Sequence, residues 1–93
     1  MTLIEHASLM SPDADTIRGV SVLYARVLDL SEVDARDDFF VLGGTSLSAV
    51  ELLALVQEEF SVQVPAGDFY RATAVSELAS LIRTLQQDET EGA

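Results

Sequence analysis

The chain has no cysteine and no lysine among its 93 residues, and its one histidine is His6. Without cysteine it has no disulfide, no cysteine-bound zinc and no thiol nucleophile, which fits a reducing cytoplasm. Without lysine, Schiff-base catalysis is excluded, and a Ser-His-Asp triad would have to use His6. A chain this short also has little room for an enclosed substrate pocket of roughly 300 Å³ or more. These absences argue against an enzyme that works by itself.

Positive charge is scarce as well. Sixteen Asp and Glu residues oppose five cations, all of them arginine, and the formal net charge is −11. Because nucleic acids and anionic membranes are bound largely through cations, neither is an expected partner. The sequence has no apolar run near the ~20 residues of a membrane span, and it does not start with a signal peptide. We expect a cytoplasmic monomer.

Hydrophobic residues make up 48% of the chain, enough for a small core, and their spacing is helical. Residues 1–10 show no pattern and are expected to form a loosely ordered leader. A first helix is predicted over about 12–29, where Ser11 provides a cap and Pro12 suits the first helical position. A long loop over 30–45 follows, and its apolar residues should hold it to the core. These anchors are Leu30, Val33, Phe39, Phe40 and Leu42.

A second helix is predicted from Ser46 to Phe60. With about 100° of rotation per residue, one arc of this helix collects its core-facing residues. They are Ala49, Leu53, Val56 and Phe60. The opposite arc is acidic and faces solvent, with Glu51, Glu58 and Glu59. The helix is therefore amphipathic.

The last third of the chain predicts one brief helical turn over 68–71 and a final helix that Thr73 caps. The final helix carries an unbroken apolar stripe of Val75, Leu78, Leu81, Ile82 and Leu85. An acidic, flexible tail is expected over 87–93. The predicted fold is all-α: a small bundle of three main helices and one short one, formed by residues 11–86.

The most informative segment lies at the junction of the loop and the second helix. Gly43 and Gly44 place the Ser46 hydroxyl next to a turn without side chains, at a helix N-terminus. Free N–H groups and the positive end of the helix dipole favour a phosphate there. No histidine or lysine stands nearby in sequence to activate the hydroxyl. Ser46 is therefore suited to modification by another protein.

The same residues are also compatible with an ordinary loop end. Thr45 or Ser46 could cap the helix, and Ser48 with Glu51 fits a capping box that would start it two residues later. The acidic pairs at 37–38 and 58–59 are interpreted as solvated faces, and the sequence has no ligand spacing for calcium or zinc.

The wider string FFVLGGTSL, residues 39–47, resembles the phosphopantetheine attachment motif of carrier proteins, most closely the peptidyl carrier proteins of nonribosomal peptide synthesis. The resemblance extends over about 11–86 and implies a four-helix fold of the acyl-carrier type. It implies that Ser46 takes 4′-phosphopantetheine from coenzyme A, with Gly43, Gly44 and Thr45 around the attachment site. A separate phosphopantetheinyl transferase would attach the arm, and its thiol would carry an aminoacyl or peptidyl thioester.

Two residues depart from the family pattern, and they leave the partner enzymes open. Val41 stands where aspartate is common, and Thr45 where histidine or aspartate is common. The resemblance implies an adenylating enzyme and downstream condensation or tailoring enzymes as partners, on a free-standing carrier. The alternatives are an acyl carrier for polyketide or fatty-acid synthesis, an unmodified helical adaptor, and a minimal enzyme that would depend on His6.

A partner surface is predicted on the solvent side of the second helix. Leu47 and Leu55 lie there among glutamates, with Glu51 between them. Scattered surface leucines are common, but Leu47 directly follows the attachment serine. Leu47, Glu51 and Leu55 are therefore the predicted partner-binding residues.

Overall fold

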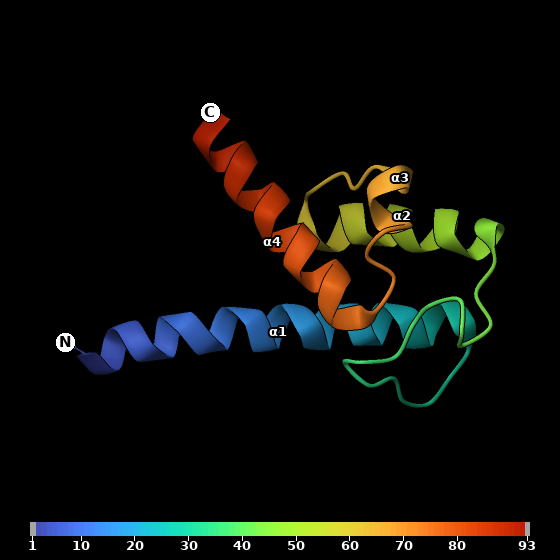
Figure 1. Cartoon of the computed structure of the whole chain (residues 1–93), viewed down its shortest axis with the longest axis horizontal. Helices are drawn as coiled ribbons and strands as arrows, with labels where there is room; N and C mark the ends of the chain where they lie inside the picture. Colours follow the sequence, from blue (N-terminus) through green and yellow to red (C-terminus); the bar gives the residue numbers. More distant parts are fainter. Residues whose placement is uncertain (1, 93) are drawn as a thin grey trace.

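The computed structural model describes the backbone of residues 2–92 and the side chains of residues 14–87. Over this backbone the chain forms four helices, α1 (Thr2–Leu28), α2 (Ser46–Phe60), α3 (Ala66–Phe69) and α4 (Val75–Gly92). In Figure 1, α2 runs beside the C-terminal half of α1, α4 crosses them obliquely, and the short α3 lies next to α2. The predicted all-α fold, with three main helices and one short one, is confirmed.

The core forms where α1 packs against both α2 and α4. Helix α1 contributes Val20, Leu23 and Tyr24, which are all buried. From α4 come Val75, Leu78, Ala79 and Ile82. Val62 and Val64, in the connector after α2, are buried as well. The apolar stripes of the sequence thus meet in one continuous core.

The ends of the first and last helices differ from the predicted ones. Helix α1 begins at Thr2, well before the start expected near residue 12, because residues 2–10 contain no glycine or proline to end a helix. Helix α4 continues to Gly92, through most of the segment expected to be a tail. The side chains of 2–13 and 88–92 lie outside the described part. The division into leader, carrier domain and tail stays a prediction.

The core face of α2 is rotated from the predicted one. Its buried residues are Ala49, Leu52 and Val56, whereas Leu53 and Phe60 are half-buried. Leu52 is fully buried in the core. Leu53 instead lines a groove toward α3, which is too short to cover it. Leu53 and Phe60 thus pack against the core, as predicted, without being fully buried, whereas Leu52, which the predicted arc left out, is fully buried.

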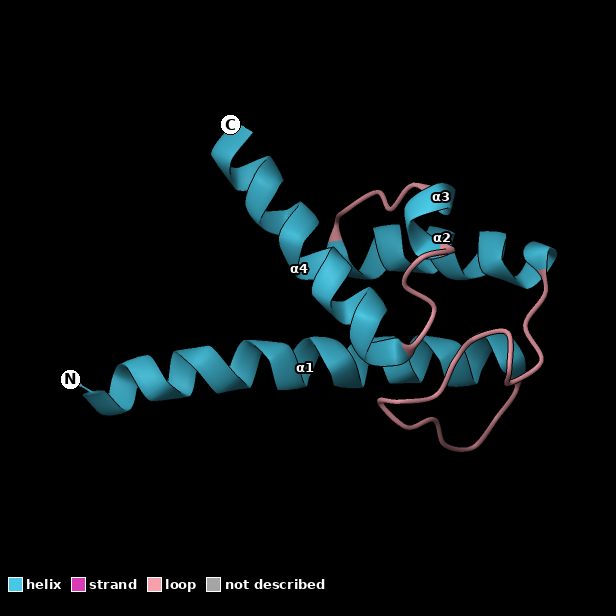
Figure 2. Ribbon diagram, viewed as in Figure 1, coloured by secondary structure: helices cyan, strands magenta, loops and turns pink. Residues whose placement is uncertain are grey.

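The loop between α1 and α2 is held to the body, as expected, although not by every predicted anchor. Figure 2 shows this loop passing along α1 before it rises to the start of α2. Phe39 is fully buried, and Val33, Phe40 and Leu42 pack against the core. Leu30 is exposed and does not act as an anchor.

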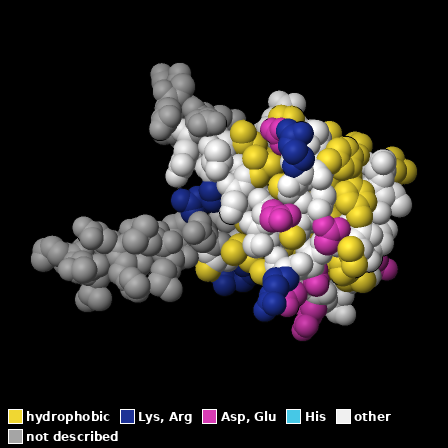
Figure 3. Space-filling view, in the orientation of Figure 1, with side chains coloured by type: hydrophobic (Ala, Val, Ile, Leu, Met, Phe, Trp, Pro, Cys, Tyr) yellow, Lys and Arg dark blue, Asp and Glu magenta, His cyan; other side chains and the backbone are white. Residues whose placement is uncertain are grey.

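Hydrophobic side chains reach the surface at the end of the molecule where α2 begins (Figure 3). The exposed large hydrophobic residues in this region include Val41, Leu47 and Val50. Across the described residues, none of the helices combines the length and the apolarity that spanning a membrane requires.

Candidate functional site

Ser46 is the first residue of α2, and Thr45 is the N-cap that precedes it. The Thr45 hydroxyl oxygen accepts a hydrogen bond from the Ser48 backbone N–H at 3.2 Å. In return, the Thr45 backbone N–H donates to the Ser48 hydroxyl oxygen at 2.7 Å. This reciprocal pair is a capping box. The alternative interpretations, in which Ser46 caps the helix or Ser48 and Glu51 form the capping box, are therefore wrong.

The capping box leaves the Ser46 hydroxyl free. Thr45 and Ser48 are both engaged in the cap, whereas within residues 14–87 no hydrogen bond joins the Ser46 hydroxyl to another residue. Its side chain is exposed. It stands at the N-terminus of a 15-residue helix, where unpaired N–H groups and the helix dipole favour negative charge. The position suits a serine that carries a phosphodiester.

The two glycines before Thr45 are required for different reasons. Gly43 has φ of +109°, a conformation that residues with a Cβ atom rarely adopt. Gly44 has ordinary φ but no space, since a Cβ atom there would lie 2.4 Å from the Phe39 ring and 2.7 Å from the Phe39 carbonyl oxygen. The double glycine thus combines a backbone turn with a close packing contact.

Phe39 connects this turn to the core. Its ring is fully buried and packs edge to face against Tyr24, at a centroid distance of 5.2 Å, and against Phe69, at 5.6 Å. Its carbonyl oxygen accepts from the Gly44 N–H at 2.9 Å. The backbone just before Ser46 is therefore fixed by the core.

Asp38 holds the same loop from the other side. Its carboxylate accepts from the backbone N–H groups of Phe40, at 3.0 Å, and Val41, at 3.1 Å, and from the Thr73 hydroxyl. The Thr73 hydrogen bond, helped by the two N–H groups, keeps the pKa of Asp38 below its usual range despite some burial. The interpretation of Asp38 as part of a solvated acidic face is wrong, because the chain uses it to join the loop to the segment before α4.

Thr73 is consequently not the cap of α4 that the sequence predicted. Its hydroxyl donates to Asp38, and its carbonyl oxygen accepts from the Tyr24 hydroxyl at 2.7 Å and from the Phe39 N–H at 3.0 Å. Burial, followed by the nearby charges of Asp38 and Glu77, raises the pKa of Tyr24. Tyr24 therefore stays a neutral hydrogen-bond donor.

The predicted partner residues do not all lie on the surface. Leu47 is 76% exposed and Glu51 is exposed, as expected. Leu55 is half-buried against the core, so its placement among solvent-facing residues is wrong. Two further residues close to Ser46 in sequence, Val41 at 84% and Val50 at 66%, are exposed and were not predicted as part of the partner surface. The helical spacing gave a signal for Val50, because this residue lies outside the predicted core-facing arc of the second helix.

No group of acidic or histidine side chains among the described residues could hold a metal ion. The side chain of His6, on which the enzyme alternative depends, lies outside the described residues.

Residues 18–82 match the protein family described as "Phosphopantetheine attachment site". The chain belongs to this family. The carrier domain is 33% identical to surfactin synthase subunit 1 of Bacillus subtilis (strain 168) over 97 residues, which cover 90% of this chain and 3% of that protein. It is also 29% identical to tyrocidine synthase 3 of Brevibacillus parabrevis over 82 residues, covering 88% and 1%. The chain spans a small fraction of these synthases.

Solved structures agree with this assignment. The carrier domain is similar to the peptidyl carrier protein in the complex of the phosphopantetheine transferase Sfp with coenzyme A, with a TM-score of 0.71 and 28% identity over 74% of this chain and 90% of that chain. The fold is also similar to that of BlmI, a type-II acyl carrier protein of Streptomyces verticillus, with a TM-score of 0.79. The two chains are 18% identical, and the match covers 84% of this chain and 94% of that chain. The resemblance to peptidyl carrier proteins is confirmed, as is phosphopantetheine as the cofactor; a carrier domain is not itself a catalyst.

Proposed function

We propose that Ser46 is the attachment residue for 4′-phosphopantetheine, and that this carrier domain holds an aminoacyl or peptidyl thioester in nonribosomal peptide synthesis. The observation that supports Ser46 is the capping box. Of the three hydroxyl residues at the start of α2, Thr45 and Ser48 hydrogen-bond to each other, and Ser46 is exposed.

The chain supplies the nucleophile and its presentation, but no base. The Ser46 oxygen forms a bond to the phosphorus next to the pantetheine, the bond from that phosphorus to the leaving nucleotide phosphate breaks, and the hydroxyl proton passes to a base of the transferase. The double glycine fixes the turn that presents the exposed Ser46, and the N-terminus of α2 stabilises the new phosphodiester charge. Once attached, the arm supplies a terminal thiol that holds the acyl group.

Intact-protein mass spectrometry tests the attachment. The protein is incubated with coenzyme A and a promiscuous phosphopantetheinyl transferase, and it should gain the mass of one phosphopantetheine. Ser46→Ala should gain none, whereas Ser48→Ala should still be modified. Modification that persists in Ser46→Ala, or that disappears only in Ser48→Ala, would refute the assignment.

The cargo is proposed from the similarity to peptidyl carrier proteins. The modified protein should accept an amino acid from an adenylating enzyme. Loading with malonyl or long fatty acyl groups alone would favour the alternative, an acyl carrier for polyketide or fatty-acid synthesis.

The proposed partners are a phosphopantetheinyl transferase, an adenylating enzyme, and condensation or tailoring enzymes. Similar carriers are found in solved structures with the transferase Sfp and with an adenylation domain. Around Ser46 the chain offers exposed Leu47 and Val50, with the charge of Glu51 beside them. With a net charge of −11, encounter should be steered by basic patches on the partners and slowed by added salt.

A further inference from the structure

A groove of about 370 Å³ lies between α1 and α2. Its lining contains Arg26 and Val27 from α1 and Glu51, Ala54 and Leu55 from α2. Val27 and Leu55 are half-buried and pack against the core, so they give the groove an apolar floor. Arg26 and Glu51 are exposed, and within residues 14–87 neither takes part in an ion pair. The groove therefore combines an apolar surface with one available cation and one available anion.

The groove is within reach of a group attached to Ser46. Glu51 is five residues after Ser46, which is about 7.5 Å along the helix axis. Leu47, which follows Ser46 directly, is exposed. It lies on the same side of α2 as Glu51 and Ala54, within an arc of roughly 60°. This side of α2 therefore leads from Ser46 past Leu47 to the groove.

We propose that the groove between α1 and α2 is the resting site of an aminoacyl group that the chain carries on its own arm. This inference rests on the proposed function. An aminoacyl thioester presents a protonated amine, a carbonyl oxygen and a side chain. The Glu51 carboxylate complements the amine, the Arg26 guanidinium donates to the carbonyl oxygen, and an apolar side chain covers Val27 and Leu55.

A second groove, of about 450 Å³, lies on the other side of α2 and has no charged residue in its lining. It is lined by Val50, Leu53, Gln63, Val64, Pro65 and Ala66. This groove suits an uncharged acyl chain, because moving an ammonium group onto an apolar surface without a partner is costly. The charged amine therefore favours the groove that holds Glu51.

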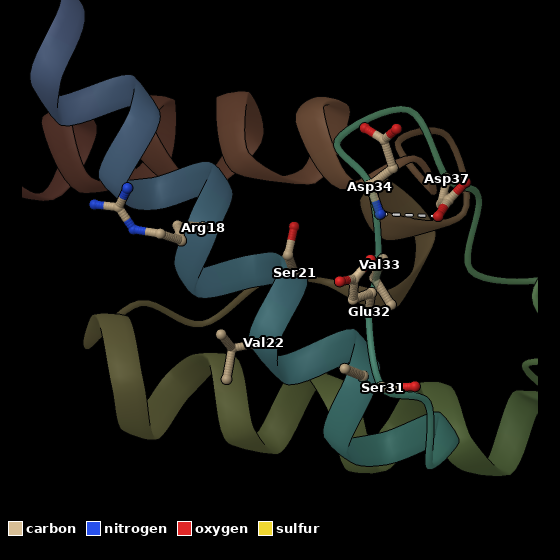
Figure 4. Close-up of a pocket in the computed structure, with 9 residues that line it drawn as sticks. Arg18, Ser21, Val22, Ser31, Glu32, Val33, Asp34 and Asp37 are labelled. Atoms are coloured by element: carbon tan, nitrogen blue, oxygen red, sulfur yellow. Dashed lines mark hydrogen bonds between the residues drawn. The ribbon is translucent and has the colours of Figure 1, made fainter.

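A third groove lies between α1 and the loop that follows it (Figure 4). It contains Arg18, Glu32 and Asp34, and the Asp34 N–H donates to the Asp37 carboxylate at 2.8 Å. No residue of α2 lines this groove, so a group on the Ser46 arm does not reach it along α2.

Methyl chemical shifts test the inference. A leucyl arm with an amide in place of the thioester is installed at Ser46 by a transferase, and the protein is compared with unloaded protein and with an N-acetyl-leucyl arm. The leucyl arm should shift the methyl signals of Val27, Ala54 and Leu55. Because acetylation removes the positive charge, the N-acetyl-leucyl arm should shift them less.

Two charge variants sharpen the test. Glu51→Gln should lower the occupancy of the groove by about two- to fivefold, the range of an exposed ion pair. Glu58→Gln removes the same charge from the solvent side of α2 but outside the groove, and should leave the shifts unchanged.

Shifts confined to Val50 and Val64, no shifts from either arm, or equal effects of the two charge variants would overturn the inference. Intact mass, recorded first, separates this outcome from failure of the proposed function. If the arm is attached at Ser46 but no methyl signal of the α1–α2 groove shifts, only the proposed resting site is contradicted. Absence of attachment contradicts the proposed function, and the groove with it.

Discussion

The Phe39 ring lies against the backbone of Gly44, at a place where a Cβ atom would come within 2.4 Å of two ring carbons. Phe39 is fully buried, and Gly44 stands two residues before Ser46. This contact makes the presentation of Ser46 depend on the packing of the core. A substitution that disturbs the contact should affect both stability and modification.

Gly44→Ala should destabilise the protein by about 1–3 kcal/mol, because the new methyl group clashes with a buried ring and with a backbone oxygen that has little freedom to move. Gly43→Ala should cost about 1–2 kcal/mol for a different reason. An added Cβ atom would meet nothing within 4 Å, but the positive φ of Gly43 is unfavourable for alanine. Gly67→Ala is the matched control, with open space and ordinary φ, and should be neutral or stabilising. Thermal melts of the three variants check this order. A Gly44→Ala protein as stable as Gly67→Ala would contradict the packing argument.

Thr45→Ala should lower the free energy of unfolding by about 0.5–2 kcal/mol, because it removes the hydroxyl that caps α2. Ser46→Ala should change it by less than about 0.5 kcal/mol, since the exposed hydroxyl takes no part in the cap. Urea denaturation measures both. The prediction fails if Ser46→Ala is the more destabilised of the two.

Leu47→Ala should slow phosphopantetheinyl transfer without lowering the melting temperature, since Leu47 is 76% exposed next to Ser46. Leu52→Ala should cost about 2–5 kcal/mol, because Leu52 is fully buried and its truncation opens a cavity in the core. The transfer rate and a melt are measured on both variants. Wild-type transfer by Leu47→Ala, or equal loss of stability in the two, would show that the proposed partner face is wrong.

The Asp38 carboxylate should make stability depend on acid pH. Its pKa is lowered in the folded chain, so its ionised form contributes stability above the ordinary carboxyl pKa, about 3.9, and this contribution is lost as the pH falls through the lower folded pKa. Asp38→Asn should therefore be less stable at neutral pH and lose less stability on acidification. Denaturation at several pH values between about 7 and 2 checks this. Parallel pH profiles for Asp38→Asn and the unaltered protein would contradict it.

The sequence by itself determined the helical pattern, the bounds of α2 from Ser46 to Phe60, and the motif that contains Ser46. These are local properties. A helix of 15 residues follows from apolar spacing, and its start follows from the glycines and hydroxyl residues just before it. The family motif is likewise a contiguous string.

Only the tertiary structure decided how deeply neighbouring residues are buried and what the loop residues do. Leu52 and Leu53 are adjacent and identical in type, yet Leu52 is fully buried and Leu53, which lines a groove with Ala66 of α3, is half-buried. Asp38 meets Thr73 across 35 residues, and Tyr24 meets it across 49. Contacts between residues so far apart in the chain depend on how the helices pack together, and local sequence patterns carry no information about that arrangement.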